Sequence, residues 1–516
     1  VESVFKRHHF AAIISVFVAF LFLLGIGFLL DYPIFQLPAA ASITILFSIL
    51  MGVAGAISYF LQTWSIPYLV IFFLLLNLFY KLEWIDPRNK AYGINYWNKS
   101  ERPAYTRDGL LKLCNKDSVA ADKKNMLTIL DAWKQKQGKE KPLLVIINTS
   151  GGGHRSASFT MSVLQQLDSI TNGDMMKNTF LINGASGGMI GAAYFRELYL
   201  RKQQGHKIHL QDIQYTNDVA GDLLNPLFTS FFARDLTAPA QKFSVGPYRY
   251  VKDRAYAFEQ KLNDNSRGYL NKQLKDYVSD EKAARIPLMF FNSVITRDSR
   301  KMLISTQPVR FMMQAPQDTT DIPMPDPDVV DYVSFFTKQD PYSTRMLTAL
   351  RMNATFPVVL PNVWLPSEPV IDVMDAGLRD NFGMETTLRF LTSFETWIKD
   401  NTAGVLIVQI RDRGAGGWEM PYVSEDIGSH VTKPFLLLQH NWFKMMEYNQ
   451  NDMLHYYSRS SVFPVHKIVF QYATGNQEDK AALNFHLTKR ELNNIRLSVM
   501  NEENTAGYKK IATMLK

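Results

Sequence analysis

The N-terminal part of this chain carries almost no charge, and no other feature of the sequence limits the possible folds as strongly. Between residues 10 and 80, Asp31 is the only charged side chain. Residues 10–30 form an uncharged run of 21 residues, long enough to cross about 30 Å of hydrocarbon as a helix. Two further apolar runs, 39–61 and 66–80, follow; Pro33 and Pro38 lie in the first break, and Pro67 lies at the start of the third run. The pattern predicts about three transmembrane helices within residues 1–84.

Two other interpretations of this region fit less well. A signal peptide has one shorter apolar run, whereas three runs follow one another here. A bundle of soluble helices would carry charged residues on a solvated face, and the sequence has almost none. Gly25, Gly27, Gly52 and Gly55 are expected to let helices approach one another closely. We therefore expect an integral membrane protein with several spans.

The basic residues that flank the apolar runs favour opposite orientations. Lys6 and Arg7 favour a cytoplasmic N-terminus. A larger cluster after the third run favours a cytoplasmic C-terminal part, and it consists of Lys81, Arg88, Lys90, Lys99 and Arg102. Three spans cannot satisfy both groups. Because the downstream cluster is larger, we predict that the globular part lies in the cytoplasm.

The remainder of the chain has the composition of an ordinary globular protein. Over the whole chain 47% of residues are hydrophobic and 20% are charged, which excludes a disordered chain. The net charge of +8 does not indicate nucleic acid as a partner, but it suits a domain held near anionic lipid. The single cysteine, Cys114, excludes an internal disulfide and a cysteine-built metal site. The histidines show no metal-binding spacing, so we predict neither a metal nor a cofactor.

The region after the apolar block alternates between strand and helix patterns. Short apolar runs typical of buried strands lie at 142–148, 179–183, 286–292, 369–374 and 404–410. Helical patterns follow the first two runs, which predicts an α/β fold with a parallel sheet and helices on both faces. We expect a connector over 85–140, with a helix near 120–137, and an α/β domain over 141–516. The aromatic and Met-rich stretch 435–457 favours core packing over a membrane-touching flap.

The second predicted strand runs into a turn of small residues, Gly184, Ala185, Ser186, Gly187 and Gly188. This matches the Gly-x-Ser-x-Gly elbow, in which a sharp strand-to-helix turn lifts a serine hydroxyl clear of the sheet. Glycines on either side of the serine avoid side-chain clashes in such a turn. A glycine-rich helix start is the plainer alternative, but the flanking strand and helix favour a nucleophile.

The first predicted strand ends in Ser150 and three consecutive glycines, Gly151, Gly152 and Gly153, followed by His154 and Arg155. Glycines at a helix start expose backbone N–H groups, which suit a phosphate or a developing oxyanion. A P-loop is excluded because no Gly-Lys-Ser/Thr follows, and a dinucleotide site lacks its third glycine and its acidic residue. We prefer an oxyanion hole, because the elbow serine lies one strand and helix later.

A carboxylate follows the fourth predicted strand. Asp375 is followed by Ala376 and Gly377, and Asn381 stands a few residues further along. A carboxylate at this end of a strand lies on the rim where α/β sheets bind ligands. Asp375 could therefore accept the proton of Ser186, although a helix-capping aspartate is the plainer explanation of this residue alone.

Taken together, the three segments resemble the patatin-like phospholipases, including the catalytic domain of cytosolic phospholipase A. That family shares Gly-Gly-Gly-x-Arg, Gly-x-Ser-x-Gly and Asp-Gly/Ala-Gly in this order, and residues 350–361 resemble its stretch before the aspartate strand. The resemblance covers about residues 141–412 and implies a three-layer α/β domain with a Ser–Asp dyad. Ser156, Ala376 and Gly383 depart from the patatin pattern.

The resemblance also implies roles for single residues. Ser186 would be the nucleophile and Asp375 the base, without a catalytic histidine. Gly151, Gly152 and Gly153 would form the oxyanion hole, and Arg155 would lie near the anionic head group of the substrate.

We thus predict a membrane-anchored serine acyl hydrolase of phospholipids or lysophospholipids, resembling bacterial inner-membrane members of the family, with the lipid bilayer as its surroundings. The alternatives are an inactive lipid-binding scaffold with the same fold and, less favoured, a nucleotide-binding membrane protein.

Overall fold

The computed structural model describes residues 2–82, 86, 88–236, 241–316, 324–355, 359–414, 427–473 and 481–516. Side chains are described from residue 10 onwards, except for 12, 33 and the 427–440 stretch of one helix. The chain divides into two compact units. The smaller comprises Val1–Lys90, Leu223–Lys261 and Val358–Pro361, and the larger comprises Ala91–Asp222, Leu262–Pro357 and Asn362–Lys516. An inserted segment of about forty residues therefore belongs with the apolar N-terminal block rather than with its sequence neighbours.

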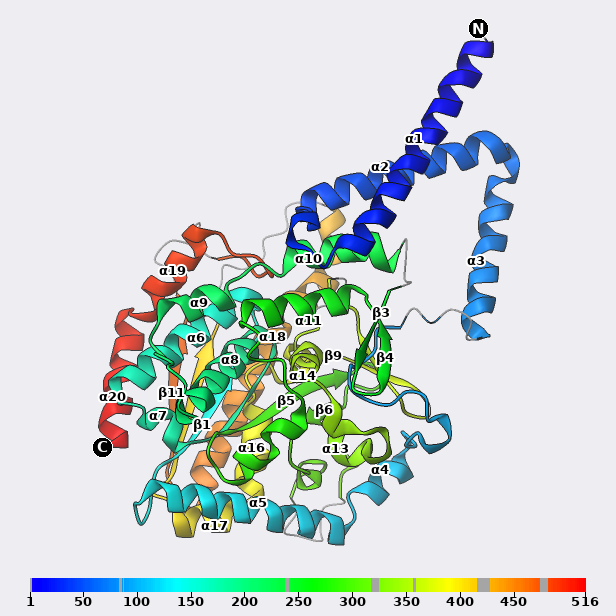
Figure 1. The fold of residues 1–516 in the computed structure, drawn as a ribbon. Helices are drawn as coiled ribbons and strands as arrows, with labels where there is room; N and C mark the ends of the chain where they lie inside the picture. Colours follow the sequence, from blue (N-terminus) through cyan, green and yellow to red (C-terminus); the bar gives the residue numbers. More distant parts are fainter. Residues whose placement is uncertain are drawn as a thin grey trace. The chain divides into compact units, whose positions relative to one another are not determined.

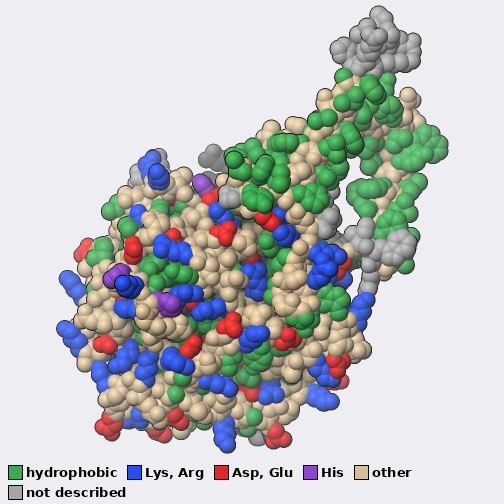
Figure 2. Space-filling model, in the orientation of Figure 1, with side chains coloured by type: hydrophobic (Ala, Val, Ile, Leu, Met, Phe, Trp, Pro, Cys, Tyr) green, Lys and Arg blue, Asp and Glu red, His purple; other side chains and the backbone are tan. Residues whose placement is uncertain are grey.

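The smaller unit contains the apolar helices and the inserted segment (Figure 1). Its elements are α1 (Glu2–Leu29), α2 (Ala39–Leu61), α3 (Ser65–Lys81), α10 (Leu224–Ser230), the π-helical turn η4 (Phe231–Asp235), β3 (Lys242–Val245), β4 (Tyr248–Val251) and the start of α11 (Arg254–Asn265). Hydrophobic side chains cover the exposed surface of the apolar helices, whereas acidic and basic side chains are scattered over the visible face of the larger unit (Figure 2). The apolar helices thus lack the solvated face that a soluble bundle needs.

The expectation of about three membrane spans is not met. One continuous helical run, Ala39–Lys81, is long and apolar enough to cross a membrane, and it contains α2 and α3 joined by a 3-10 turn at Gln62–Trp64. The apolar part of α1, Ile13–Leu29, is shorter than such a span needs. The turn at Gln62–Trp64 joins α2 directly to α3, with Gln62 at a φ of +44°, so the two apolar runs are adjacent helices of one helical run.

The larger unit is built on a nine-stranded sheet. Its strands are β1 (Leu144–Thr149), β2 (Thr179–Gly184), β5 (Leu288–Ile295), β6 (Lys301–Ile304), β7 (Val329–Asp331), β8 (Val363–Leu365), β9 (Ile371–Asp375), β10 (Val405–Arg411) and β11 (Val465–Gln471). The order β11-β10-β1-β2-β5-β6-β7 leaves β9 and β8 beside the far part of β5.

The sheet is largely parallel, as the sequence predicts, but not wholly so. Strands β11, β10, β1, β2 and β5 run parallel to one another. The fourth predicted strand, β9, runs antiparallel to β5, and so does β6. The chain thus forms a mixed α/β fold with a largely parallel sheet, and the expected parallel direction is wrong for the strand that carries Asp375.

The helices of the larger unit are α4 (Arg107–Leu113), α5 (Lys116–Gln137), α6 (Gly153–Ile170), α7 (Asp174–Asn178), α8 (Ser186–Gln203), α9 (Ile213–Val219), α12 (Val278–Lys282), α13 (Tyr332–Phe335), α14 (Met346–Asn353), α15 (Gly377–Asp380), α16 (Met384–Ser393), α17 (Glu395–Asn401), α18 (Ile427–Ser460), α19 (Lys489–Val499) and α20 (Glu502–Leu515). Helices α5 and α16 share a core with β1, β2, β5 and β10, while α6 and α8 pack together and contact the same sheet (Figure 1).

The stretch 85–140, expected as a connector, contains one of the helices of that core. Helix α5 begins at Lys116, four residues before the expected helix, because the Asn115 side chain accepts a hydrogen bond from the Ser118 amide at its N-terminus. Met126, Ile129 and Trp133 of this helix are buried against the sheet. Most of the stretch is therefore part of the folded α/β unit.

Helix α18 shows two different faces within the aromatic and Met-rich stretch 435–457. Met446 and Leu454 are buried, while Trp442, Tyr448 and Tyr456 are exposed. The core-packing interpretation therefore holds for one face of the helix only. The side chains of residues 435–440 lie outside the described part of the chain.

Candidate active site

The predicted elbow lies where β2 ends and α8 begins. Ser186 is the first residue of α8 and has a φ of +53°, a conformation that non-glycine residues rarely adopt. Such strained backbone persists only where the surrounding structure holds it, and it is common at functional sites. The side chain is 7% exposed. The sequence motif thus forms a sharp strand-to-helix turn with the serine at its apex.

Asp375 reaches this elbow because β2 and β9 lie along the same edge of β5. Phe291 of β5 pairs with Gly184 on one edge and with Ile304 on the other, and Ser293 pairs with Asp375 opposite its β6 partner. Strand β2 runs parallel to β5 and β9 antiparallel, so their carboxyl ends meet two residues apart along β5. The turn at Ser186 and the residue Asp375 therefore lie next to each other, at the point along β5 where β2 and β9 both end.

Ser186 and Asp375 lie close together, and the Ser186 side chain is one of the groups that lower the pKa of Asp375. The Gly377 amide donates a hydrogen bond to Oδ1 of Asp375 at 2.7 Å. Burial raises the pKa of Asp375 to about 7, although the Gly377 amide and the Ser186 side chain partly offset that rise. A carboxyl group that titrates near neutral pH is suited to give and take a proton there.

Two residues of the segment 350–361 form hydrogen bonds around Asp375 and the elbow strand. The Asn353 side chain, at the end of α14, donates to the carbonyl oxygens of Gly184 (3.0 Å) and Asn292 (2.7 Å). The Asp375 amide donates to the Thr355 carbonyl at 3.1 Å. Residues 356–358 of this segment lie outside the described part of the chain. Asn353 thus links the elbow strand to β5 next to the aspartate loop.

The glycine loop packs against the elbow backbone to backbone. The Gly188 amide donates to the Ser150 carbonyl at 3.2 Å. A Cβ added at Gly187 would lie 1.9 Å from the carbonyl oxygen of Gly153. Ser156, which departs from the patatin pattern, donates to the Ser150 carbonyl at 2.6 Å and so stabilises the loop. The two motifs therefore form one unit, and glycine at 187 is required by this close approach.

One of the three glycine amides is already engaged. The Gly151 amide donates to Oδ1 of Asn381 at 3.0 Å. The Asn381 amide in turn donates to Sδ of Met446 on α18 (3.2 Å). Among the described residues, the amides of Gly152 and Gly153 have no hydrogen-bond acceptor. Asn381 therefore ties the glycine loop to the aspartate loop and leaves these two amides for a ligand.

Arg155 lies in a buried ion pair rather than on an open surface. Its guanidinium pairs with Asp412 and donates to the Ala481 carbonyl at 2.7 Å. Burial would raise the pKa of Asp412, but the Arg413 and Arg155 guanidinium groups hold it below its usual value. Asp412 also approaches Gly152, where an added Cβ would lie 2.6 Å from the carboxylate. Arg155 thus holds Asp412 in place next to the glycine loop.

His154 is buried in the first turn of α6. Its Nε2 atom lies 2.8 Å from the Gly221 carbonyl, and burial lowers its pKa to about 4. Among the described residues, no group of three or more His, Cys, Asp and Glu side chains is placed to hold a metal ion.

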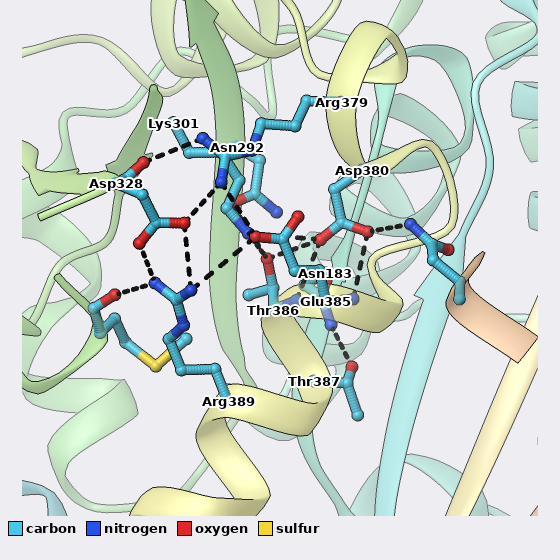
Figure 3. A network of polar contacts seen from close by, with 12 residues as sticks. Asn183, Asn292, Lys301, Asp328, Arg379, Asp380, Glu385, Thr386, Thr387 and Arg389 are labelled. Atoms are coloured by element: carbon cyan, nitrogen blue, oxygen red, sulfur yellow. Dashed lines mark hydrogen bonds and ion pairs between the residues drawn. The ribbon is translucent and has the colours of Figure 1, made fainter. Parts of the chain in front are cut away.

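A buried charge network fixes the loop that follows Asp375 (Figure 3). Asp380 is fully buried and accepts hydrogen bonds from the Thr386 hydroxyl (2.8 Å) and from Gln450 of α18 (2.9 Å). Lys301 of β6 lies 3.7 Å from Asp380 and 3.1 Å from Glu385. Burial would raise the pKa of Glu385, but Lys301, Arg379 and Arg389 lower it. The aspartate loop is thus held by β6, α16 and α18 together.

Several residues that shape this site were not predicted individually from the sequence: Asn353, Asn381 as a link between the loops, Asp412, Lys301 and Asp380. Asp380 and Asn381 follow the Asp-Ala-Gly segment closely, so their position next to it was a usable signal. Asn353 lies within the segment 350–361 that the resemblance indicated, but no local motif connects Lys301 or Asp412 to the site.

Replacing Gly187 with alanine is expected to disrupt the packing of the two motifs. The new methyl group would lie 1.9 Å from a backbone oxygen, so the glycine loop must shift. We expect the free energy of unfolding to fall by about 1–3 kcal/mol and ester hydrolysis to fall by about 100-fold or more. Thermal unfolding and a soluble-ester assay measure both.

The matched control for this variant is Gly55→Ala in α2, where an added Cβ meets nothing within 4 Å. It should leave ester hydrolysis unchanged and should not lower the free energy of unfolding, because alanine is favoured over glycine inside a helix. Wild-type activity in the Gly187→Ala variant would show that the elbow and the glycine loop do not act as one unit.

Comparison with known proteins gives a distant structural likeness only. No protein-family model matches the chain, and no curated protein matches its sequence. Human GIVD cytosolic phospholipase A2 aligns with 79% of this chain and 66% of its own, just under two thirds, at 11% identity and a TM-score of 0.37. VipD from Legionella pneumophila aligns with 73% of this chain and 67% of its own, at 11% identity and a TM-score of 0.25.

Proposed function

We propose that this protein is a serine acyl hydrolase that cleaves carboxylic esters of membrane lipids, with Ser186 as nucleophile and Asp375 as general base. The proximity of Ser186, at a strained elbow, to the buried Asp375 at the neighbouring strand end carries this proposal. The order of the three motifs and their backbone contacts support it. The long apolar run Ala39–Lys81 supports a membrane anchor, which places the enzyme where lipid esters are concentrated.

The proposed reaction has two halves. Asp375 accepts the proton of Ser186 as Oγ attacks the ester carbonyl, which forms a tetrahedral intermediate with a negatively charged oxygen. The amides of Gly152 and Gly153 donate to that oxygen, and each such donor lowers the barrier by roughly 3–4 kcal/mol. The protonated Asp375 then gives its proton to the departing alcohol as the carbon–oxygen bond breaks. A fatty acyl group remains on Ser186.

Water completes the cycle. Asp375 takes a proton from a water molecule, which attacks the acyl carbonyl and passes through the same amide-stabilised intermediate. The ester bond to Ser186 breaks, Oγ regains a proton from Asp375, and the fatty acid leaves. The products are a free fatty acid and an alcohol, the latter being a lysophospholipid when the substrate is a diacyl phospholipid.

Labelling with a fluorophosphonate tests the proposal, because this reagent phosphonylates an activated serine. The full-length protein in detergent micelles is expected to react once per chain, and peptide mass mapping should place the adduct on Ser186. Release of fatty acid from mixed phospholipid vesicles should fall in proportion to labelling. An unlabelled Ser186 together with no fatty acid release would contradict the hydrolase proposal, and retained binding to lipid vesicles would then favour an inactive lipid-binding scaffold.

A further inference from the structure

The inserted segment, defined here as residues 223–261, packs on the turn between the first two apolar helices. Asn225 accepts a hydrogen bond from the Ala39 amide at 2.8 Å and so caps α2, whose own N-cap residue, Pro38, offers no side-chain cap. Thr229 donates to the Leu37 carbonyl at 3.0 Å. The segment therefore satisfies backbone groups at the end of an apolar helix, where a bilayer would leave them without partners.

The same segment neutralises the one charge of the apolar block. Arg234 of η4 is buried, donates to the Gly27 carbonyl at 2.9 Å and pairs with Asp31 at 2.8 Å. Lys252 pairs with Asp31 from the other side. A Cβ at Gly27 would lie 2.3 Å from the Ala233 carbonyl oxygen, so this glycine serves the inserted segment and not a second apolar helix. The C-terminal end of α1 therefore packs against residues 223–261 through a hydrogen bond and ion pairs.

The β3–β4 hairpin of this segment has one aromatic face and one basic face. Phe243 pairs with Tyr250 across the strands, and its ring centroid lies 4.5 Å from that of Tyr256. On the opposite face Lys242 and Arg249 are exposed. Within the described part of the chain, neither basic side chain has an acidic partner, and residues 241–252 contain no acid at all. The aromatic face packs inward, since Tyr250 is buried, whereas exposed cations beside the end of an apolar helix suit the anionic headgroups of the membrane–water interface.

We propose that the β3–β4 hairpin lies in the headgroup layer and binds anionic phospholipid through Lys242 and Arg249. This inference rests on the part of the proposed function that makes Ala39–Lys81 a membrane anchor, and it does not depend on hydrolysis. A hairpin fixed to the α1–α2 turn is held at the depth where an apolar helix leaves the hydrocarbon. Charge complementarity then selects an anionic bilayer surface over a neutral one.

A fluorescent label at the hairpin tip tests this proposal. Full-length Pro247→Cys protein, made with Cys114→Ala and Ser186→Ala so that only the tip is labelled and lipid is not consumed, carries the dye NBD in reconstituted vesicles. Vesicles contain phosphatidylcholine alone or mixed with phosphatidylglycerol, with nitroxide-labelled headgroups as quenchers. We expect stronger quenching with phosphatidylglycerol and a loss of the difference at high salt.

Charge-reversed Lys242→Glu/Arg249→Glu protein is expected to lose that difference, because two cations near an anionic surface together change the docking equilibrium roughly 25-fold. Lys509→Glu/Lys510→Glu in α20, an equal change of charge at exposed positions, should keep it. The neutral Lys242→Gln/Arg249→Gln variant covers the case in which charge reversal prevents folding.

Equal quenching in both vesicle types, or quenching unchanged by either hairpin variant, would overturn the proposal. Labelling of Ser186 by fluorophosphonate is measured separately in protein that keeps its serine. Failure of the hairpin proposal and failure of the hydrolase proposal are therefore distinguishable.

Discussion

Ser186→Ala protein is expected to release fatty acid from phospholipid vesicles at a rate about 10⁴-fold or more below that of the wild type, because removal of a nucleophile abolishes the covalent route. Alanine keeps the backbone and Cβ of the elbow, so the glycine loop and Asp375 should stay in place. The thermal midpoint should therefore remain close to that of the wild type. Lipid mass spectrometry of the products measures the rate and also identifies the ester that is cleaved.

Two companion variants make this result specific. Ser458→Ala, an exposed serine on α18, should retain full activity. Ser186→Gly should be as inactive as Ser186→Ala. Its free energy of unfolding should exceed that of Ser186→Ala by about 1 kcal/mol, because glycine adopts a φ of +53° without strain. Fatty acid release by Ser186→Ala at the wild-type rate would disprove the role of Ser186.

Asp375→Asn protein is expected to lose roughly 10²–10⁴-fold in kcat/KM at pH 8, because asparagine cannot accept the Ser186 proton. For the wild type, burial raises the pKa of Asp375 to about 7, so kcat/KM should fall about tenfold per pH unit below that value. The variant should lack this acid limb. A pH profile from 5 to 9 with a soluble ester, which avoids vesicle effects, separates the two curves.

The contribution of Asp375 to the free energy of unfolding should fall as pH rises, whereas kcat/KM should increase. In the unfolded chain Asp375 titrates near its ordinary value of 3.8, whereas in the folded protein its pKa is about 7. Between these values the folded state binds more protons than the unfolded state, so this group lowers stability as pH rises through that window. Asp375→Asn removes the effect. Its thermal midpoint relative to the wild type should rise between pH 5 and pH 8, and a constant difference would contradict the burial of an ionisable group here.

Local patterns explain why parts of this protein could be predicted. The runs at 142–148 and 179–183 are continuous, β-branched and apolar, and they form the buried strands β1 and β2. The elbow glycines indicated a sharp turn, and Ser186 lies at its apex. In each case a few neighbouring residues contain the whole signal.

Features that depend on distant contacts were not predictable in the same way. The direction of β9 is set by its pairing with β5, about eighty residues earlier in the chain, and nothing in 369–374 encodes it. The partner of Arg155 is Asp412, which no spacing rule connects to the glycine loop. The association of 223–261 with the apolar helices was missed because its caps and ion pairs involve single residues, such as Asn225 and Arg234.

The meeting of β2 and β9 along β5 has a consequence for motion at this site. Both strands are hydrogen-bonded to one continuous backbone, which fixes the spacing between the turn at Ser186 and Asp375. We therefore expect larger motions in elements that pack against the loop after Asp375, such as α18, and expect the amides of Phe291 and Ser293 to be among the slowest in the protein to exchange with deuterium.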